Sequence, residues 1–354
     1  MHRCKNISFA NLKLLSAEAR RCKLFCRGII MNTCDFAEGR VLSIQSHVVS
    51  GYVGNKSATF PLQILGFEVD AINSVQFSNH TGYAYFKGQV LDSTQLEQLM
   101  TGLRFNNILN YTHLLTGYIG NESFVRKIAD VAKELKEINP GVIYVCDPVM
   151  GDNGQMYVPP EILPIYQNEI LPIANIITPN QFEAEILTGI TIKTEEDAWE
   201  AVEKIHSQGP ETVIITSTNL GPEDKLMGLA SNSKGLSFLL HQLKCMSKVE
   251  FIHLDGKKLR VRLNIPKLAC SFTGTGDLFT ACFLAWMFKT NGDIKIASEK
   301  TVSTVQDVLK RTFKAAENKP LESDLAWVAA TELKLIQSKN DIENPKTPFE
   351  AQIV

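Results

Sequence analysis

The chain has 354 residues, of which 44% are hydrophobic and 21% are charged, a composition typical of a folded globular protein. Its 36 Lys and Arg residues nearly balance 38 Asp and Glu residues, giving a formal net charge of −2, so nucleic acid is not an expected partner. The most apolar stretch, residues 278–288, is shorter than the ~20 residues that a membrane helix needs, so a membrane is not an expected partner either.

The first 39 residues form a basic extension. Lys and Arg dominate through residue 32, where Glu18 is the single acid. Such a start is found in mitochondrial transit peptides, and it also fits an upstream start, with Met31 opening the chain. We favour the second interpretation and expect residues 1–39 to be disordered. The eight cysteines are too dilute for a disulfide scaffold, so we expect a cytosolic protein, with mitochondrial targeting as the alternative.

From residue 40 onward, short apolar runs alternate with helical patterns. The clearest helical pattern collects six residues on one face: Phe124, Ile128, Val131, Ala132, Leu135 and Ile138. The continuous apolar runs are typical of strands buried on both faces, and they occupy residues 41–45, 68–73, 112–115, 142–146, 175–178 and 212–216. This alternation predicts a mostly parallel sheet between helices, with ligands bound beyond the carboxyl ends of the strands.

Two carboxylates follow the fourth of these runs. Asp147 and Asp152 lie on a loop shaped by Pro and Gly, where they can hold Mg²⁺ through water beside phosphates, although a plain Asp-Pro turn fits as well. After the fifth run, Asn180 and Glu183 fall on one face of the incoming helix. That pair can orient metal-bound water, and it fits a capping box equally well.

The strongest chemical candidate is Gly274-Thr275-Gly276-Asp277, directly before the apolar stretch 278–288. Glycines let the backbone approach a ligand, and the first N–H groups of a buried helix form an anion site. Asp277 can then act as the general base that takes a proton from an alcohol during phosphoryl transfer. Alone, the four residues also fit a capped loop without function. The chain carries neither a P-loop nor a dinucleotide-binding fingerprint.

Polar and aromatic groups after the first two strands suit a planar, hydrogen-bonding substrate. They lie around Ser46 and in the stretch from Ser78 to Tyr83. His47 and His80 are part of these stretches, and we expect both to satisfy local hydrogen bonds rather than to catalyse.

In chain order, eight motifs resemble those of the pyridoxal kinases of the ribokinase-like superfamily: SIQSHVVSGYVGNKSA, SVQFSNHTGY, LLTGY, VCDPVMGD, MYVP, ITPNQFEAE, VIITS and FTGTGDLF. The resemblance covers residues 40–354 as one kinase domain, apart from residues 234–258. It implies a ribokinase-like three-layer α/β/α sandwich with a mostly parallel central sheet. It also implies ATP-dependent phosphorylation of the 5′-hydroxymethyl group of pyridoxal, pyridoxine or pyridoxamine.

By the same resemblance, Asp277 is the catalytic base, and the anion hole is formed by Gly274, Thr275 and Gly276. The residues expected to contact the acceptor are Ser46, Val53, Thr81, Tyr118 and Asp277. Those expected near the nucleotide are Asp147, Asp152, Tyr157, Thr178, Asn180, Thr216, Ser217, Phe272, Gly274 and Thr275. Those expected near the metal are Asp147, Asp152, Thr178 and Glu183. Tyr157 would lie on a loop that closes over the site.

The resemblance further implies ATP with Mg²⁺, or Zn²⁺ as the alternative divalent ion, activation by K⁺ or another monovalent cation, and a homodimer. Residues 234–258 depart from it, because this segment is longer and more apolar than the family's usual turn, at a place where the nucleotide's base is expected to bind. We interpret it as an insertion that can weaken ATP binding or promote aggregation. Two alternatives stay open: another small-alcohol kinase of the same fold, acting on hydroxymethylpyrimidine, a sugar or a nucleoside, and a non-catalytic B6-binding protein.

Overall fold

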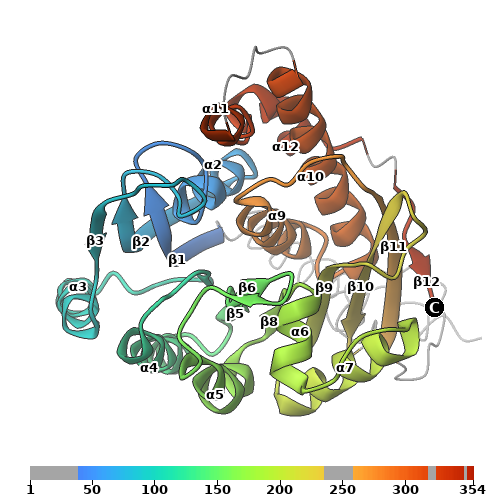
Figure 1. The fold of residues 1–354 in the computed structure, drawn as a ribbon. Coiled ribbons are helices and arrows are strands. Elements are labelled where there is room, and N and C mark those ends of the chain that lie inside the picture. The colour runs from blue at the N-terminus through green and yellow to red at the C-terminus, as the bar shows by residue number, and fades with distance from the viewer. Residues whose placement is uncertain (1–38, 235–257, 318–323, 347–348) are drawn as a thin grey trace, which may run out of the picture.

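The computed structural model describes residues 39–234, 258–317, 324–346 and 349–354 (Figure 1). Most of the expected N-terminal extension, residues 1–38, and most of the expected insertion, residues 235–257, lie outside the described residues. The first strand begins at Gly39, one residue before the expected start of the domain. No helix in the described ranges has both the length and the apolar character needed to cross a bilayer.

One large sheet runs through the described part of the chain, in the order β12-β11-β10-β9-β8-β5-β4-β1-β2-β3. The six strands from β9 to β2 in this order are parallel to their neighbours, whereas β3 and β10 to β12 pair in antiparallel fashion. The strands are β1 (Gly39–Val48), β2 (Phe67–Phe77), β3 (Gly88–Val90), β4 (His113–Thr116), β5 (Ile143–Cys146), β8 (Ile176–Ile177), β9 (Thr212–Thr218), β10 (Lys225–Asn232), β11 (Leu259–Pro266) and β12 (Gln352–Ile353). A separate ribbon pairs β6 (Gly151–Asp152) with β7 (Gln155–Met156).

The six strands predicted from apolar runs are confirmed as β1, β2, β4, β5, β8 and β9, the parallel centre of the sheet. The side chains of β1, β4 and β5 are covered on both faces, which is why these strands are continuous apolar runs, whereas β2 has exposed residues at Glu68, Ala71 and Gln76. The sequence analysis missed the antiparallel strands β3, β10, β11 and β12. These strands lie toward the edges of the sheet, where one face or one side is open and the apolar pattern is interrupted.

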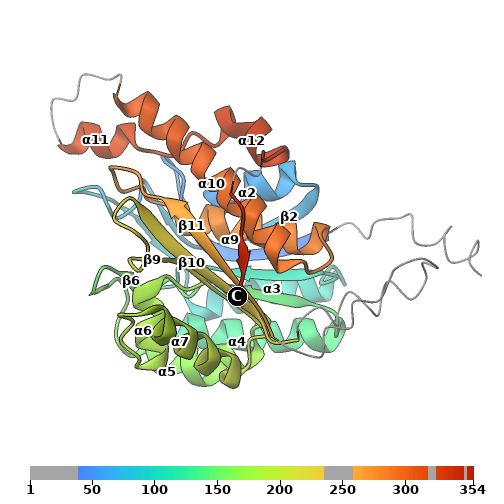
Figure 2. The same cartoon turned by 90° about the vertical axis from the view of Figure 1, so that its right-hand side faces the viewer.

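Helices cover both faces of the sheet (Figures 1 and 2), which confirms the three-layer sandwich. One layer contains α3 (Ser93–Phe105), α4 (Glu122–Ile138), α5 (Ile162–Ile165), α6 (Gln181–Thr188), α7 (Glu195–Gln208) and the short turns η1 (Tyr166–Ile170) and η2 (Leu171–Ile173). The other contains α2 (Asn55–Ile64), α9 (Thr275–Lys289), α10 (Ile294–Glu317), α11 (Asp324–Ala330), η3 (Ile336–Ser338) and α12 (Lys339–Glu343). Each layer has its own hydrophobic core against the sheet.

Helix α4 confirms the predicted helical pattern, because Phe124, Ile128, Val131, Ala132 and Leu135 are all buried. Ile138, the last residue of the pattern and of the helix, is 52% exposed. Helix α9 is buried on all sides from Leu278 to Met287, as its apolar sequence predicts. It packs against α2 and α10, so its first turn is held rigidly at the edge of the sheet.

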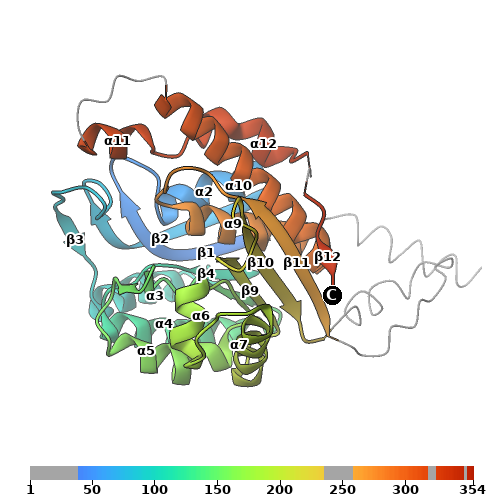
Figure 3. The ribbon, with the colours of Figure 1, turned by 45° about the vertical axis from the view of Figure 1, so that its right-hand side comes forward.

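The antiparallel pair of β10 and β11 shows where the described chain stops and resumes on either side of the expected insertion (Figure 3). Met227, near the start of β10, pairs with Thr218 at the end of β9, and Asn232 pairs with Thr212 at the start of β9. Asn232 also pairs with Leu259 of β11. The ends of β10 and β11 next to residues 235–257 therefore lie at the amino-terminal edge of the parallel strands. The expectation that this segment interrupts the place of the nucleotide's base falls on residues outside the described ones and stays a prediction; the strand ends that flank it lie opposite the carboxyl edge, where ligands bind in such sheets.

Candidate active site

The first turn of α9 meets the loop between β1 and α2. Gly274 adopts the left-handed conformation (φ 82°, ψ 7°), and a Cβ atom there would lie 2.0 Å from the carbonyl oxygen of Tyr52. Only glycine permits this approach. The hydroxyl of Ser57, on α2, donates a hydrogen bond to the carbonyl oxygen of Gly274 (3.1 Å). The N–H groups that follow lie at the positive end of a buried helix without acceptors in the preceding turn, so this geometry favours an anion.

Asp277 lies in the first turn of α9, and its side chain is only partly exposed. Burial raises its pKa to about 6, although a hydrogen bond from the backbone N–H of Gly54 acts in the opposite direction. The group is therefore ionised at neutral pH and accepts a proton more readily than an ordinary aspartate. A carboxylate with this pKa beside an anion site is suited to general-base chemistry on a phosphate acceptor.

Asp147 follows the last residue of β5 and is 4% exposed. Its Oδ2 atom has no hydrogen-bond partner among the described residues, and it lies 3.5 Å from where a Cβ atom of Gly276 would be. Burial, together with the negative charges of Glu183 and Asp277, raises the pKa of Asp147 well above its usual range. A buried oxygen without a donor is costly, and a bound cation would remove that cost.

Asn180 and Glu183 form a complete capping box at the start of α6, so the structural interpretation of this pair is confirmed. The carboxylate of Glu183 accepts hydrogen bonds from the backbone N–H groups of Met150 (3.0 Å) and Asn180 (2.9 Å). The amide of Asn180 donates to the carbonyl oxygen of Gly151 (2.8 Å). Burial raises the pKa of Glu183 to about 8 despite these bonds. The pair holds the β6–β7 ribbon next to Asp147.

The structure gives less direct support for a metal contact by the other two expected residues, Asp152 and Thr178. Asp152 is exposed and accepts hydrogen bonds from its neighbour Asn153, and the buried Thr178 bonds to the hydroxyl of Thr280 (2.8 Å). Within the described ranges, no three His, Cys, Asp or Glu side chains are grouped as metal ligands. The unsatisfied oxygen of Asp147 fits one protein contact to a Mg²⁺ ion that takes its remaining ligands from phosphates and water.

The expected nucleotide contacts spread from this centre along the carboxyl edge. Tyr157 is 55% exposed after β7, and burial and the charges of Asp152 and Glu183 raise its pKa. Thr216 and Ser217 are half-buried near the end of β9, where the backbone N–H of Thr216 donates to Pro179 (2.9 Å). The half-buried Phe272 accepts a hydrogen bond at its carbonyl from the hydroxyl of Thr275, just before α9.

The expected acceptor contacts fall into two groups. Ser46 and Val53 are buried beside the anion site, and a Cβ atom at Gly54 would lie 2.4 Å from the Ser46 hydroxyl oxygen. Thr81 is exposed on the loop between β2 and β3, and the half-buried Tyr118 follows β4. The described contacts do not join Thr81 or Tyr118 to Asp277, so only the first group is shown beside the proposed base.

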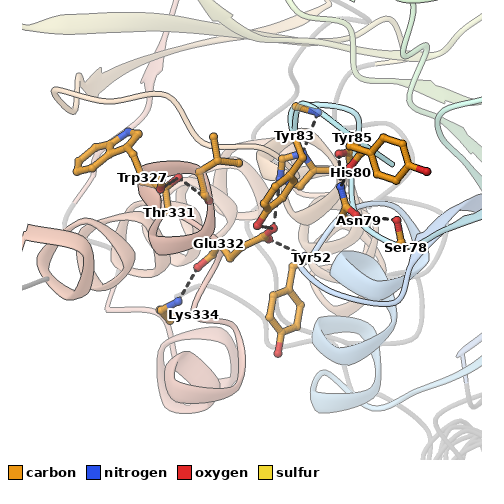
Figure 4. Close-up of polar contacts among 12 residues, drawn as sticks. Tyr52, Ser78, Asn79, His80, Tyr83, Tyr85, Trp327, Thr331, Glu332 and Lys334 are labelled. Atoms are coloured by element: carbon orange, nitrogen blue, oxygen red, sulfur yellow. Dashed lines mark hydrogen bonds and ion pairs between the residues drawn. The ribbon is translucent and has the colours of Figure 1, made fainter. Parts of the chain in front are cut away.

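Sequence reasoning missed three groups that touch this region: Gly54 as a donor to Asp277, Thr280 as a partner of Thr178, and Glu332. Glu332 accepts a hydrogen bond from Tyr52 although the two residues are 280 positions apart in the chain, and no motif marks it. His80 accepts a local hydrogen bond from the backbone N–H of Gly82, as expected, but it also contacts the distant Glu332, which was not expected (Figure 4). His47 differs, because its buried Nδ1 has no partner among the described residues.

Comparisons with known proteins identify relatives of this chain. A family model described as phosphomethylpyrimidine kinase matches residues 71–248. The pyridoxal kinase of Ovis aries is 49% identical over 326 residues, covering 90% of this chain and 99% of the relative. The pyridoxal kinase of Homo sapiens is 47% identical over 323 residues, with coverage of 90% and 99%. A solved structure of pyridoxal kinase from Leishmania donovani in complex with ADP and pyridoxamine has a TM-score of 0.78 and 34% identity, covering 90% of this chain and 100% of that chain.

The likeness extends along nine-tenths of this chain and nearly all of each relative, so it includes both edges of the sheet and both helical layers. The large parallel sheet between two helical layers is the ribokinase-like fold. The family model by itself covers about half of the chain and bears the name of a different small-alcohol kinase, whereas the relatives cover most of it and are pyridoxal kinases. The chain therefore belongs to the pyridoxal kinase family.

Proposed function

We propose that this protein transfers the γ-phosphoryl group of ATP to the 5′-hydroxymethyl group of pyridoxal, pyridoxine or pyridoxamine. The observation that carries the proposal is the position of Asp277 in the first turn of α9, next to a backbone that favours an anion. The relatives that cover nine-tenths of the chain are pyridoxal kinases, and one of their solved structures is a complex with ADP and pyridoxamine. The site and the kinship support the same reaction.

In this reaction, the oxygen of the acceptor hydroxyl attacks the γ-phosphorus, the bond between that phosphorus and the ADP oxygen breaks, and Asp277 takes the hydroxyl proton. A pKa of about 6 leaves Asp277 ionised at neutral pH, yet basic enough to accept the proton as the oxygen–phosphorus bond forms. The N–H groups at the start of α9, after Gly274, stabilise the charge on the transferred group. Phosphoryl transfer needs this positioning and neutralisation more than covalent help.

For the divalent ion, we propose Mg²⁺ beside Asp147. When bound, Mg²⁺ would neutralise the phosphate charge. Asp147 supports this role because its buried Oδ2 has no partner among the described residues and is directed to the Gly276 backbone. Asn180 and Glu183 act one step further out, by holding the ribbon of β6 and β7 in place beside Asp147.

The remaining proposals rest on the family resemblance and on the surface of the molecule. Ser46, Val53, Thr81 and Tyr118 would surround the vitamin, and Tyr157, Thr216, Ser217 and Phe272 the nucleotide. Activation by K⁺ follows from the resemblance alone. A homodimer is supported by the exposed edge strand β3 and the loop before it, where Tyr85, Phe86 and Val90 are exposed. A cytosolic location is supported by the free thiols of Cys146, Cys270 and Cys282.

One alternative has an observation in its favour, because the matching family model is described as phosphomethylpyrimidine kinase. The decisive experiment follows ADP release from purified protein with Mg-ATP and K⁺ on a panel of pyridoxal, pyridoxine, pyridoxamine, hydroxymethylpyrimidine, ribose and adenosine. We expect the three B6 vitamers to have the highest kcat/KM, and omission of Mg²⁺ to abolish turnover. Preference for hydroxymethylpyrimidine would select the alternative kinase. Vitamin binding without ADP release would select a non-catalytic B6-binding protein.

A further inference from the structure

A buried carboxylate outside the catalytic centre joins loops that are distant in the sequence (Figure 4). Glu332 follows α11, and its side chain is 12% exposed. Its Oε2 atom accepts a hydrogen bond from the backbone N–H of Tyr52 (3.0 Å). Its Oε1 atom accepts from the hydroxyl of Tyr83 (3.0 Å) and lies 3.2 Å from Nε2 of His80. One side chain of the C-terminal region thus contacts the loop after β1 and the loop after β2.

The position of the proton on the His80 ring follows from a second contact of that ring. The backbone N–H of Gly82 donates to Nδ1 of His80 (3.1 Å), so Nδ1 is the acceptor and the ring proton is on Nε2. His80 therefore donates to Glu332. Burial and the charge of Glu332 raise the pKa of Tyr83 to about 12, which keeps its hydroxyl protonated as a donor. Three donors converge on two oxygens, and only a carboxylate accepts at both of them.

The same contacts reach the proposed catalytic centre. Tyr52, whose N–H is held by Glu332, has its carbonyl oxygen packed against Gly274, where a Cβ atom would lie only 2.0 Å away. Gly51 has a left-handed backbone (φ 95°), and a Cβ atom there would lie 2.4 Å from the Glu332 carboxylate. The carboxylate thus fixes the loop whose next residues are Val53 and Gly54.

On the other side, Glu332 fixes the loop that contains Thr81. His80 and Tyr83 flank Thr81 and Gly82 in the chain, their rings lie 4.8 Å apart between centroids, and both are held by the same carboxylate. A Cβ atom at Gly82 would lie 3.8 Å from the Thr273 hydroxyl, next to the anion site. An exposed residue such as Thr81 contributes to recognition only if its loop is held in place.

We propose that Glu332 is a positioning residue for the acceptor, a clamp that sets the distance between the Thr81 loop and the base-bearing turn of α9. This inference rests on the proposed function, because it assigns the vitamin to the space between these loops. Glu332 touches neither the reacting hydroxyl nor the phosphate in this scheme, and it acts through Tyr52, His80 and Tyr83. Its loss should weaken binding of the acceptor while ATP still binds at the far side of the site.

The test is Glu332→Gln, with KM for pyridoxal and for ATP measured separately in the full-length protein. The Gln amide would face a donor at one of its two ends, so at least one hydrogen bond to a charged acceptor is lost. We expect KM for pyridoxal to rise about tenfold or more, while KM for ATP stays within about twofold. An unchanged KM for pyridoxal, or an equal rise of both KM values, would overturn the inference.

A milder variant keeps the test meaningful if Glu332→Gln folds poorly. Tyr83→Phe removes one hydroxyl and keeps the ring, so KM for pyridoxal should rise about threefold, again without a matching change for ATP. Glu343→Gln, an exposed acid on α12, is the matched control and should change neither value. If the unaltered protein phosphorylates no B6 vitamer, the proposed function fails. If it does, and Tyr83→Phe and Glu332→Gln show no selective change, only the clamp is refuted.

Discussion

The carboxylates around the proposed base and the carboxylates at the amino-terminal edge of the central sheet have opposite surroundings. At the carboxyl edge, three acids lie close together and the described ion pairs include none of them: Asp147, Glu183 and Asp277. At the amino-terminal edge, acids are matched with bases, in the pairs Arg40–Asp70, Lys234–Glu211, Lys258–Glu203 and Arg260–Glu203. Both edges belong to the same strands, so the difference is not a property of the fold itself.

This difference in the surroundings of the acids indicates where a charged ligand is expected to bind. Burial raises the pKa of Glu183 to about 8 and that of Asp277 to about 6, so these two acids at the carboxyl edge resist ionisation. At the other edge, hydrogen bonds from Lys258 and Arg260 outweigh burial and lower the pKa of Glu203. Uncompensated buried charge destabilises a protein, and its persistence at one edge fits a site completed by a cation and phosphates.

The two edges are expected to differ most in the effect on turnover when one acid is neutralised at each of them. We expect Asp277→Asn to lower kcat about 10³-fold, because a positioned general base contributes roughly 10²–10⁴-fold. ATP binding, measured by calorimetry with Mg²⁺, should stay within about threefold, since the start of α9 is unchanged. Thermal stability should be equal or higher, because a partly buried charge is removed.

Glu203→Gln is the matched variant at the amino-terminal edge. Its pairs with Lys258 and Arg260 are partly exposed, so the loss of stability should be at most about 1 kcal/mol, and kcat should not change. An Asp277→Asn enzyme that keeps more than a tenth of normal kcat would contradict the proposed difference between the two edges of the sheet. A Glu203→Gln enzyme with impaired turnover would contradict it as well.

A smaller effect is expected in the pH dependence of stability without ligand. The folded-state pKa values of Glu183 (about 8) and Asp277 (about 6) lie above their ordinary values of 4.5 and 3.8. Between about pH 4 and pH 8, the folded state therefore holds more protons than the unfolded state, and the free energy of unfolding falls as pH rises. Glu203 has a lowered pKa and contributes the opposite slope, with stability lost only as the pH falls into the acid range.

Urea denaturation at intervals from pH 5 to pH 8.5 measures this slope. Saturating Mg-ATP should flatten it, because a bound cation favours ionised carboxylates. Asp147→Asn should also flatten it without ligand, since it removes an acid whose own pKa is raised by burial and by the charges of Glu183 and Asp277. A free energy of unfolding that rises steadily with pH across this range would contradict the inference that these acids lack a compensating positive charge.

Much of the fold could be predicted because its centre has a strong physical signature. Strands β1, β4 and β5 are buried on both faces, and the buried α9 is apolar all round, so both leave continuous apolar runs in the sequence. Strands β10 and β11 leave a weaker signal, since β11 alternates buried residues with Arg260, Arg262 and Asn264. Their antiparallel direction, and with it the position of the strand ends that flank residues 235–257, depends on pairing that no local pattern reveals.

The candidate site divides in the same way. Asp277 could be predicted because GTGD and the helix that follows are contiguous, and Asp147 because it ends an apolar run. The role of Asn180 and Glu183 was ambiguous, since a capping box and a metal pair have the same spacing. Glu332 could not be predicted, because its partners lie about 250 to 280 residues away and its own surroundings in the sequence are ordinary.

The smallest effect is expected from shortening the hairpin of β10 and β11. Replacement of residues 235–257 by an Asn-Gly turn should leave kcat and KM for ATP within about twofold, because Asn232 and Leu259 pair at the edge opposite the proposed base. The shorter connection lowers the closure entropy only slightly, so the melting temperature should stay equal or rise by a few degrees. Steady-state kinetics and thermal melts of the two chains provide the comparison. A tenfold rise in KM for ATP would show that the amino-terminal edge takes part in nucleotide binding after all, and the separation of the two edges would fail.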